Sequence, residues 1–346
     1  MQRRAGYNAG LTAQGPLIGF VLAHEQFPVN ELVELGVAAE QAGFDAVWTS
    51  DHFHPWQDNQ GHAGFAWATL AALGQRTERI KLGTGVTCPI YRYHPAIVAE
   101  AFASLGILYP GRMFLGVGTG EALNEVPPTG GAWGDYAERS ARLEEAVKLI
   151  RRLWTGEWSD FNGTYYHLKH ARLYDVPAPP APIYIAAAGK KSMRMAGEQG
   201  DGLITDEQGV TSQEMRQAFA EGARAAGKQP DHLPVLVEQY VVVGDRAEAE
   251  RWAPLWQFKT GTKQYLEYDD PVAIEHDARQ QQPLDKVIAS MTVGAEPEPH
   301  RAALKKLLDA GATHVFIHSP QQDQRRVIEF YAQEVLPSLH LEVTRC

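Results

Sequence analysis

The chain has 346 residues, 44% of them hydrophobic and 21% charged, which is typical of a globular protein with a large apolar core. Its net charge of −10 and the lack of any basic run argue against nucleic acid or an anionic membrane surface as a partner. Two cysteines and no stretch of 18 apolar residues exclude a disulfide scaffold and a membrane-spanning protein, and we expect a cytoplasmic protein.

Strand-like and helix-like segments alternate along almost the whole chain. Short apolar runs that predict buried strands lie at 17–23, 46–50, 80–86, 113–117, 183–187, 202–205, 233–243 and 314–318. Between them, apolar residues at helical spacing and the accompanying caps predict helices at 30–42, 64–74, 95–108, 136–154, 190–198, 212–226, 299–310 and 322–335.

About eight strands, nearly all followed by a helix, predict an α/β protein with the (β/α)8 TIM-barrel fold. Two stretches break the alternation. One lies at about 155–180, where 160–166 reads as a hairpin with an Asn-Gly turn. The other, at about 250–285, is less regular. We therefore expect a single domain over residues 1–346 with insertions at these two places.

Polar side chains follow the predicted strands, at the barrel face where ligands bind. The segment Ser50-Asp51-His52-Phe53-His54-Pro55-Trp56 follows the second strand, and Glu25 follows the first. An acid, an imidazole and an indole together suggest acid–base chemistry. From the residues alone, an Asp-His pair is more often structural, and a packed aromatic is the less favoured alternative for Trp56. Glu25 would orient His52 or bind a substrate hydroxyl, and a solvated loop acid explains it almost equally well.

Four motifs in the same order resemble the coenzyme F420-dependent sugar-6-phosphate dehydrogenase group of the luciferase-like monooxygenase superfamily: 50–56, Gly83-Thr84-Gly85-Val86-Thr87, Tyr91-Arg92-Tyr93-His94-Pro95 and 116–125. Within that group, Trp56-Gln57-Asp58-Asn59, Gly61-His62 and 87–95 are most similar to the F420-dependent hydroxymycolic acid dehydrogenase branch. The resemblance implies a luciferase-like TIM barrel, coenzyme F420, a small-molecule alcohol or sugar substrate and a homodimer. No recognisable twin-arginine export signal, which that branch can carry, is present.

The resemblance also implies roles for individual residues. His52 would be the general base, Glu121 the acid that serves N1 of the deazaflavin, and Trp56 would help to hold the reacting centre. The cofactor would be held by residues from three segments: Asp51 and Asn124; a non-proline cis peptide at Gly85-Val86, followed by Thr87; and a phosphate-binding turn at Ala187, Ala188, Gly189 and Lys190. From the residues alone, an ordinary Gly-rich turn and tight strand–helix packing explain the last two segments equally well.

The expected substrate is a neutral alcohol. Members that act on sugar phosphates hold the phosphate with Lys and Arg from three places, but here one reads Thr205-Asp206-Glu207-Gln208-Gly209 and another, 287–291, has no arginine. Acidic residues would repel a phosphate dianion. In the third place Lys259 or Lys263 remains as a candidate substrate contact. Glu25, at the end of the first strand, is a further candidate.

Three alternatives remain open. The chain would otherwise be an F420-dependent glucose-6-phosphate dehydrogenase, an FMN-dependent monooxygenase of the same superfamily, or a non-catalytic F420-binding protein. The thirteen histidines show no metal-ligand spacing, so no metal is expected. The leading hypothesis is an F420-dependent dehydrogenase that oxidises a non-phosphorylated sugar or a secondary alcohol by hydride transfer to C5.

Overall fold

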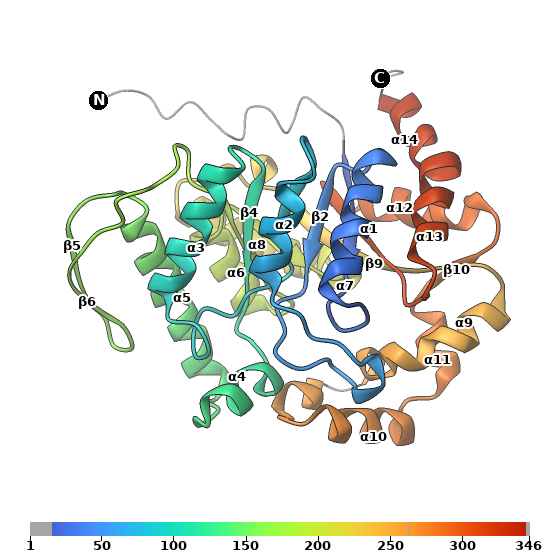
Figure 1. The fold of residues 1–346 in the computed structure, drawn as a ribbon, viewed down its shortest axis with the longest axis horizontal. Helices are drawn as coiled ribbons and strands as arrows, with labels where there is room; N and C mark the ends of the chain where they lie inside the picture. The colour runs from blue at the N-terminus through green and yellow to red at the C-terminus, as the bar shows by residue number, and fades with distance from the viewer. Residues whose placement is uncertain (1–15, 262, 344–346) are drawn as a thin grey trace.

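The computed structural model describes residues 16–261 and 263–343, and its centre is a closed barrel of eight parallel strands (Figure 1). The barrel strands follow the order β1-β2-β3-β4-β7-β8-β9-β11. Their bounds are β1 Leu17–Leu22, β2 Ala46–Thr49, β3 Lys81–Thr84, β4 Met113–Val117, β7 Ile183–Ala186, β8 Gly202–Thr205, β9 Val235–Val243 and β11 His314–His318. The predicted TIM-barrel fold is thus confirmed.

The barrel closes because the last strand pairs with the first. Leu17 of β1 lies beside His314 of β11, and β11 in turn pairs with β9 in parallel register. The strands are buried along nearly their whole length, as expected where helices cover a parallel sheet. Each predicted barrel strand lies within one or two residues of its observed position.

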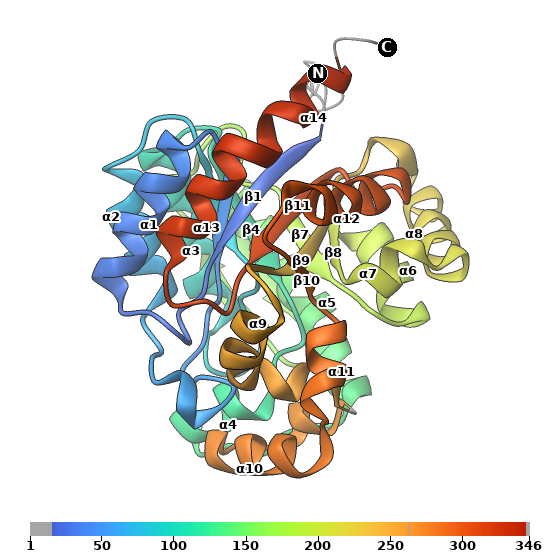
Figure 2. The same ribbon diagram turned by 90° about the vertical axis from the view of Figure 1, so that its right-hand side faces the viewer.

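Helices surround the barrel on its outer side (Figure 2). They follow the strands in the expected alternation, so right-handed crossovers return the chain to the next parallel strand. The principal ones are α1 Val29–Gln41, α2 Ala66–Gly74, α3 Pro95–Leu108, α5 Tyr136–Leu153, α6 Lys190–Gln199, α8 Gln213–Ala225, α12 Pro297–Asp309 and α13 Gln324–Phe330. In the described part of the chain, no helix combines the length and apolar character needed to cross a membrane.

The lower half of the barrel interior is filled by large apolar side chains. Trp48 of β2 stacks on Phe316 of β11 with ring centroids 3.9 Å apart and an angle of 7°, and Leu236 of β9 belongs to the same cluster. Because side chains alternate along a strand, the next inward positions, towards the carboxyl ends, are free to carry polar groups. The packed layer therefore supports the site from below.

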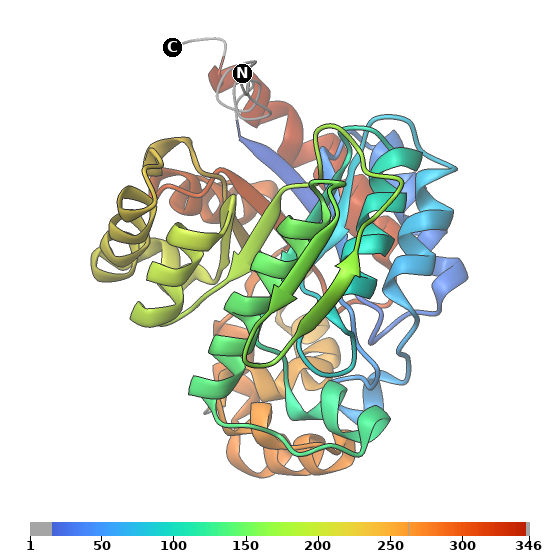
Figure 3. The same cartoon turned by 90° about the vertical axis from the view of Figure 1, so that its left-hand side faces the viewer.

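The hairpin expected near 160 lies outside the barrel as β5 Ser159–Asn162 and β6 His167–Ala171 (Figure 3). Its loop is longer than the predicted two-residue Asn-Gly turn, because residues 163–166 connect the strands. The Glu145 carboxylate of α5 accepts hydrogen bonds from the backbone of Thr164, Tyr165 and Tyr166. A side chain from another element therefore fixes this loop.

The second irregular stretch folds into helices that cover the carboxyl end of the barrel. They are α9 Arg246–Trp252, η4 Ala253–Thr260, η5 Lys263–Glu267, α10 Pro271–Gln281 and α11 Leu284–Ala289, and Figures 1 and 2 show them at the same end as α4 Ala122–Thr129. Three further short elements have no counterpart among the predicted ones: α4, which contains Pro127 and Pro128, α7 Glu207–Thr211 and β10 Thr292–Gly294, which pairs with β9. The final predicted helix continues through η6 Tyr331–Val335 into α14 Leu336–Val343.

Candidate active site

A cavity of about 960 Å³ opens where the carboxyl ends of the barrel strands meet. Its wall includes most of the predicted site residues: Glu25, His52, Trp56, Gly85, Val86, Glu121, Ala187, Ala188, Gly189, Lys190 and Lys259. These residues come from segments far apart in the sequence, and the barrel brings them together because parallel strands all end at the same face. The cavity is large enough for a cofactor and a small substrate.

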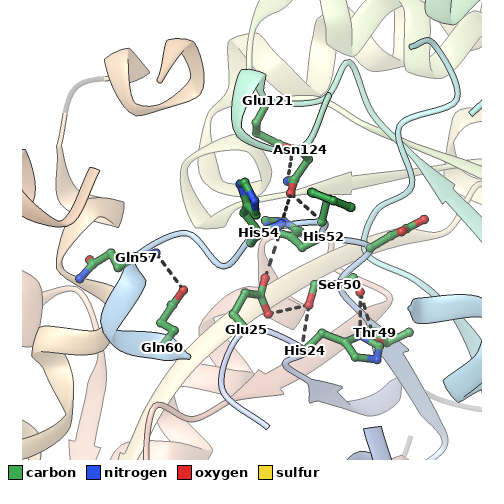
Figure 4. A network of polar contacts seen from close by, with 12 residues as sticks. His24, Glu25, Thr49, Ser50, His52, His54, Gln57, Gln60, Glu121 and Asn124 are labelled. Atoms are coloured by element: carbon green, nitrogen blue, oxygen red, sulfur yellow. Dashed lines mark hydrogen bonds and ion pairs between the residues drawn. The ribbon is translucent and has the colours of Figure 1, made fainter. Parts of the chain in front are cut away.

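His52 is held with one ring nitrogen directed towards a carboxylate. Its Nδ1 lies 3.1 Å from the backbone oxygen of His54, and since a carbonyl only accepts, Nδ1 carries the hydrogen in this arrangement. Its Nε2 is then the basic atom, and it lies 3.6 Å from Oε1 of Glu25 (Figure 4). The Glu25 carboxylate would stabilise His52 once Nε2 takes up a proton.

Glu25 is itself fixed by a buried network. Its Oε2 accepts a hydrogen bond of 2.6 Å from Ser50, whose Oγ accepts one from the backbone N–H of His24 (Figure 4). The His24 ring contacts the backbone oxygen of Ser50 through Nδ1 and Thr69 through Nε2. Burial lowers the pKa of His24, so it acts as a neutral structural group in this network. No sequence motif pointed to this role of His24.

Asn124 connects the histidine segment with the predicted acid. Its Oδ1 accepts hydrogen bonds from the backbone N–H groups of Phe53 and His54, at 2.8 and 3.2 Å, and its Nδ2 donates to Oε2 of Glu121 at 3.3 Å (Figure 4). The side chain is 1% exposed and does not belong to the cavity wall. It is placed to position two neighbouring segments, whereas a cofactor contact had been expected.

Asp51 and Thr87 lie behind the cavity wall. Asp51 accepts hydrogen bonds from Thr87 at 2.7 Å, from Arg92 at 2.9 Å and from Tyr93 at 3.1 Å, and both residues are buried and absent from the lining. Glu125 lies on the far side of Arg92, accepts a hydrogen bond from its backbone, and has its pKa raised to about 7 by burial. Asp51 thus anchors the segment that carries His52.

One side of the cavity is lined by backbone and small side chains. The Gly85-Val86 peptide bond is cis, in agreement with the resemblance, and a Cβ added to Gly85 would lie 2.6 Å from the ring of Trp48. Glycine therefore lets the chain pass directly over the Trp48 ring at the base of the cavity. A smooth surface of this kind suits the face of a flat ring system.

The turn before α6 presents the start of a helix to the same cavity. Gly189 is the residue before the helix, and Ala187, Ala188 and Gly189 all line the wall. Backbone N–H groups in the first helical turn lack partners within the helix, so they favour an anion such as a phosphate. Lys190 also lines the wall, although its Nζ pairs with Glu214 at 2.5 Å on the surface. These residues fit the phosphate of a bound cofactor.

An aromatic group forms the wall near His52. Trp56 contacts the His52 ring at 4.8 Å, stacks on Phe258 at 4.8 Å and meets the edge of Tyr265 at 5.4 Å. The neighbouring Trp256 is buried and donates a hydrogen bond to the side chain of Gln26. Trp56 is therefore packed against its aromatic neighbours and at the same time lines the cavity.

Of the two lysines expected to contact substrate, Lys259 lines the cavity. Its Nζ lies 3.4 Å from the centroid of the Tyr240 ring, and burial lowers its pKa to about 8. Lys263 begins η5, but its side chain lies outside the described residues. Glu238 and His318 also line the wall. Sequence reasoning missed both, although the alternation along 233–243 and 314–318 would have pointed them inward.

Two of the three places at which related enzymes hold a sugar phosphate, 205–209 and 287–291, contribute residues to the cavity wall. Asp206, Glu207 and Gln208 line it from the start of α7, and Ser290 lines it at the end of α11. Asp206 caps α7 by accepting a hydrogen bond from Gly209, and Glu207 pairs with Lys306. The charge at these positions is acidic or neutral. Within the described residues, no group of three or more His, Cys, Asp or Glu is arranged to hold a metal ion.

Comparisons with known proteins agree with this architecture. The luciferase-like monooxygenase family matches residues 10–314. An F420-dependent hydroxymycolic acid dehydrogenase of Mycobacterium tuberculosis is 50% identical over 93% of this chain and 88% of its own length, and an F420-dependent glucose-6-phosphate dehydrogenase of Mycolicibacterium gilvum is 43% identical over 93% and 97%. The structure of an F420-dependent secondary alcohol dehydrogenase with an F420–acetone adduct superimposes with a TM-score of 0.89, at 32% identity, over 94% of this chain and 99% of the other.

Proposed function

This chain belongs to the luciferase-like monooxygenase family, and we propose that within it the protein oxidises a neutral alcohol, either a non-phosphorylated sugar or a secondary alcohol. It is an F420-dependent oxidoreductase that acts on CH–OH groups. The observation that carries the proposal is the placement of His52 and Glu121 on one cavity, with Glu25 behind the basic nitrogen of His52.

The geometry supports separate acid–base roles for two titratable groups, His52 and Glu121. His52 Nε2 would accept the proton of the substrate hydroxyl, and Glu25 would stabilise the resulting imidazolium. Bound F420 supplies a carbon, C5, that accepts the hydride. Glu121 would serve N1 of the same ring, and Asn124 holds Glu121 and the His52 segment at a fixed separation.

The cofactor would lie along the side of the cavity formed by Gly85, Val86 and the residues 187–190. Val86 and the small residues offer a surface for the ring, and the start of α6 offers N–H groups to a phosphate. Asp51, Thr87 and Asn124 would support this arrangement from behind the wall. The named relatives depend on F420, which weakens the FMN alternative, and the complete acid–base set argues against a non-catalytic protein.

The choice of a neutral substrate rests on charge. Asp206, Gln208 and Ser290 line the cavity. The resemblance implies that cations at these places would be needed to hold a phosphate dianion, and an acid there would repel it. A glucose-6-phosphate dehydrogenase remains the second candidate because such an enzyme is 43% identical and Lys259 faces the cavity. A single domain, a homodimer and a cytoplasmic location remain our predictions from the sequence.

The proposal is tested by mixing the protein with oxidised F420 and following the loss of its visible absorption. Glucose, glucose 6-phosphate and isopropanol are supplied separately. We expect bleaching with glucose or isopropanol and at most slow bleaching with the phosphate. Bleaching with glucose 6-phosphate alone would overturn the neutral-substrate proposal and favour the second candidate.

A further inference from the structure

A second polar cluster faces the cavity from strands β9 and β11. Side chains alternate along β9, so that Leu236 lies in the apolar layer while Glu238 and Tyr240, two and four residues later, line the cavity. His318 occupies the neighbouring position on β11, where it pairs in register with Tyr240. None of these groups has a part in the proton and hydride transfers described above.

The Glu238 carboxylate is rigidly held but incompletely used. His318 Nδ1 donates to its Oε1 at 2.7 Å, and the His318 ring is fixed between Tyr240, stacked at 4.4 Å, and Trp256, edge-on at 4.3 Å. The Glu238 side chain nevertheless remains 31% exposed, and it lines the cavity. A carboxylate accepts about four hydrogen bonds, so acceptor capacity remains on the cavity side.

Lys259 complements this carboxylate with a donor. Its Nζ rests on the face of Tyr240, a favourable position for an ammonium group, and in the described part of the chain no carboxylate forms an ion pair with it and no acceptor receives a hydrogen bond from it. Its three N–H groups are therefore available. Glu238 is the carboxylate that most favours its charged form.

A neutral hydroxyl group suits the Glu238–Lys259 pair better than an apolar group or a phosphate does. It donates to Glu238 and accepts from Lys259, satisfying both. A simple alcohol or an apolar tail would leave the Lys259 ammonium group without an acceptor and would cover the free acceptor positions of Glu238 without a donor, which is unfavourable. A phosphate would satisfy Lys259 but be repelled by Glu238 and Asp206.

The aromatic wall agrees with the same kind of substrate. The indole of Trp56, backed by Phe258 and Tyr265, offers a flat apolar surface beside His52. The C–H face of a sugar ring packs on such a surface while its hydroxyl groups point outwards. One cavity thus combines a proposed reacting centre, a stacking surface and a second pair of charged groups.

We propose that Glu238 and Lys259, with His318 as a positioning residue, form a subsite for a hydroxyl group other than the one that His52 deprotonates, so that the physiological substrate is a polyhydroxy compound of the sugar class. This inference rests on the proposed function. It selects between the two kinds of neutral alcohol that the proposed function allows.

The test compares wild-type protein with Glu238→Gln and Lys259→Met, using F420 bleaching with D-glucose and with isopropanol. Gln preserves the size of the side chain and an acceptor for His318 but removes the charge. We expect the ratio of kcat/KM for glucose to that for isopropanol to fall at least about tenfold in both variants. Glu221→Gln, on the surface beside Arg194, is the matched control and should leave the ratio unchanged.

Equal losses for both alcohols, an unchanged ratio, or a wild-type preference for isopropanol would overturn the subsite. If wild-type protein bleaches F420 with neither alcohol, the neutral-alcohol assignment fails for these substrates. The subsite is then judged by titrating F420-loaded protein with glucose and following tryptophan fluorescence. A saturable change that is lost in Glu238→Gln supports it, and no change in wild-type protein overturns it.

Discussion

Nε2 of His52 and Oε1 of Glu25 face each other at a distance of 3.6 Å. Both side chains are almost fully buried, at 8% and 2% exposure. The contact with the His54 carbonyl favours the tautomer in which Nδ1 of His52 carries the hydrogen. Nε2 of His52 and Oε1 of Glu25 are then both acceptors, so a proton that binds to Nε2 is stabilised by the Glu25 carboxylate. This relationship underlies the first two predictions.

His52→Gln should abolish the proposed base while filling most of the same space. We expect kcat for F420 reduction to fall by about 10²–10⁴-fold, with little change in the Kd for F420, because His52 does not support the phosphate side of the cavity. Stopped-flow absorbance gives kcat and fluorescence titration gives Kd. Turnover within a fewfold of wild type would exclude His52 as the base.

Glu25→Gln should remove the charge that stabilises protonated His52 while retaining an acceptor for Ser50. A loss of roughly ten- to a hundredfold in kcat is expected, smaller than that of His52→Gln, because the base itself remains. Steady-state kinetics on both variants and on the double variant measure the coupling. Strictly additive losses would show that the two residues act independently.

Asn124→Ala should uncouple the base from the acid. It leaves the N–H groups of Phe53 and His54 without their acceptor, and we expect about 1–3 kcal/mol lower free energy of unfolding, with a lower kcat. Urea unfolding and F420 bleaching measure the two effects. Asn124→Asp is the matched second variant, because it keeps both backbone contacts but places a carboxylate beside Glu121. If Asn124→Asp has the stability of wild type but a lower kcat, the contact between Asn124 and Glu121 matters for turnover.

Glu125→Gln should change the pH dependence of stability. Burial raises the Glu125 pKa from 4.5 to about 7, so between these values the folded state keeps a proton that the unfolded state has lost. The contribution of this bound proton to the free energy of unfolding is complete below pH 4.5 and is lost as the pH rises through 7. At pH 8 the free energy of unfolding of the variant should therefore exceed that of wild type by an amount on the order of 3 kcal/mol.

Urea unfolding of wild type and Glu125→Gln between pH 5 and 8 tests this sign. The Gln side chain can still accept the hydrogen bond from the Arg92 backbone. Glu144→Gln, in an exposed pair with Lys148, should run parallel to wild type. Parallel curves for Glu125→Gln would contradict the expected protonation.

Introducing cations where phosphate partners are missing should admit a phosphorylated substrate. Gln208→Lys combined with Ser290→Arg adds two positive charges to the cavity wall, and we expect kcat/KM for glucose 6-phosphate, relative to glucose, to rise about tenfold or more. The increase should shrink at high ionic strength. Gln208→Asn with Ser290→Asn is the neutral control, and an equal rise in it would refute the electrostatic explanation.

The sequence was sufficient to predict the fold and the family because both are recognised from patterns within short segments of the chain. Strand 314–318 and helix 95–108 show their apolar periodicity within a few residues, and the alternation of such segments leaves a parallel barrel as the natural arrangement. The sequence did not predict α4, which contains Pro127 and Pro128. It also did not predict the short helices within about 250–285, because these pack against one another and against the end of the barrel rather than showing a periodicity of their own.

The residues that we propose carry the chemistry were also visible in the sequence, since His52, Glu121 and Glu25 each follow a strand and all three line the same cavity. Only the tertiary structure decided how each one acts. Asp51, Thr87 and Asn124 lie behind the wall, while Glu238, inside a strand, reaches the cavity. Such differences depend on the direction of a side chain and on neighbours more than 70 residues away, as for Asn124 and Phe53, and burial and hydrogen-bond geometry arise only once the barrel has closed.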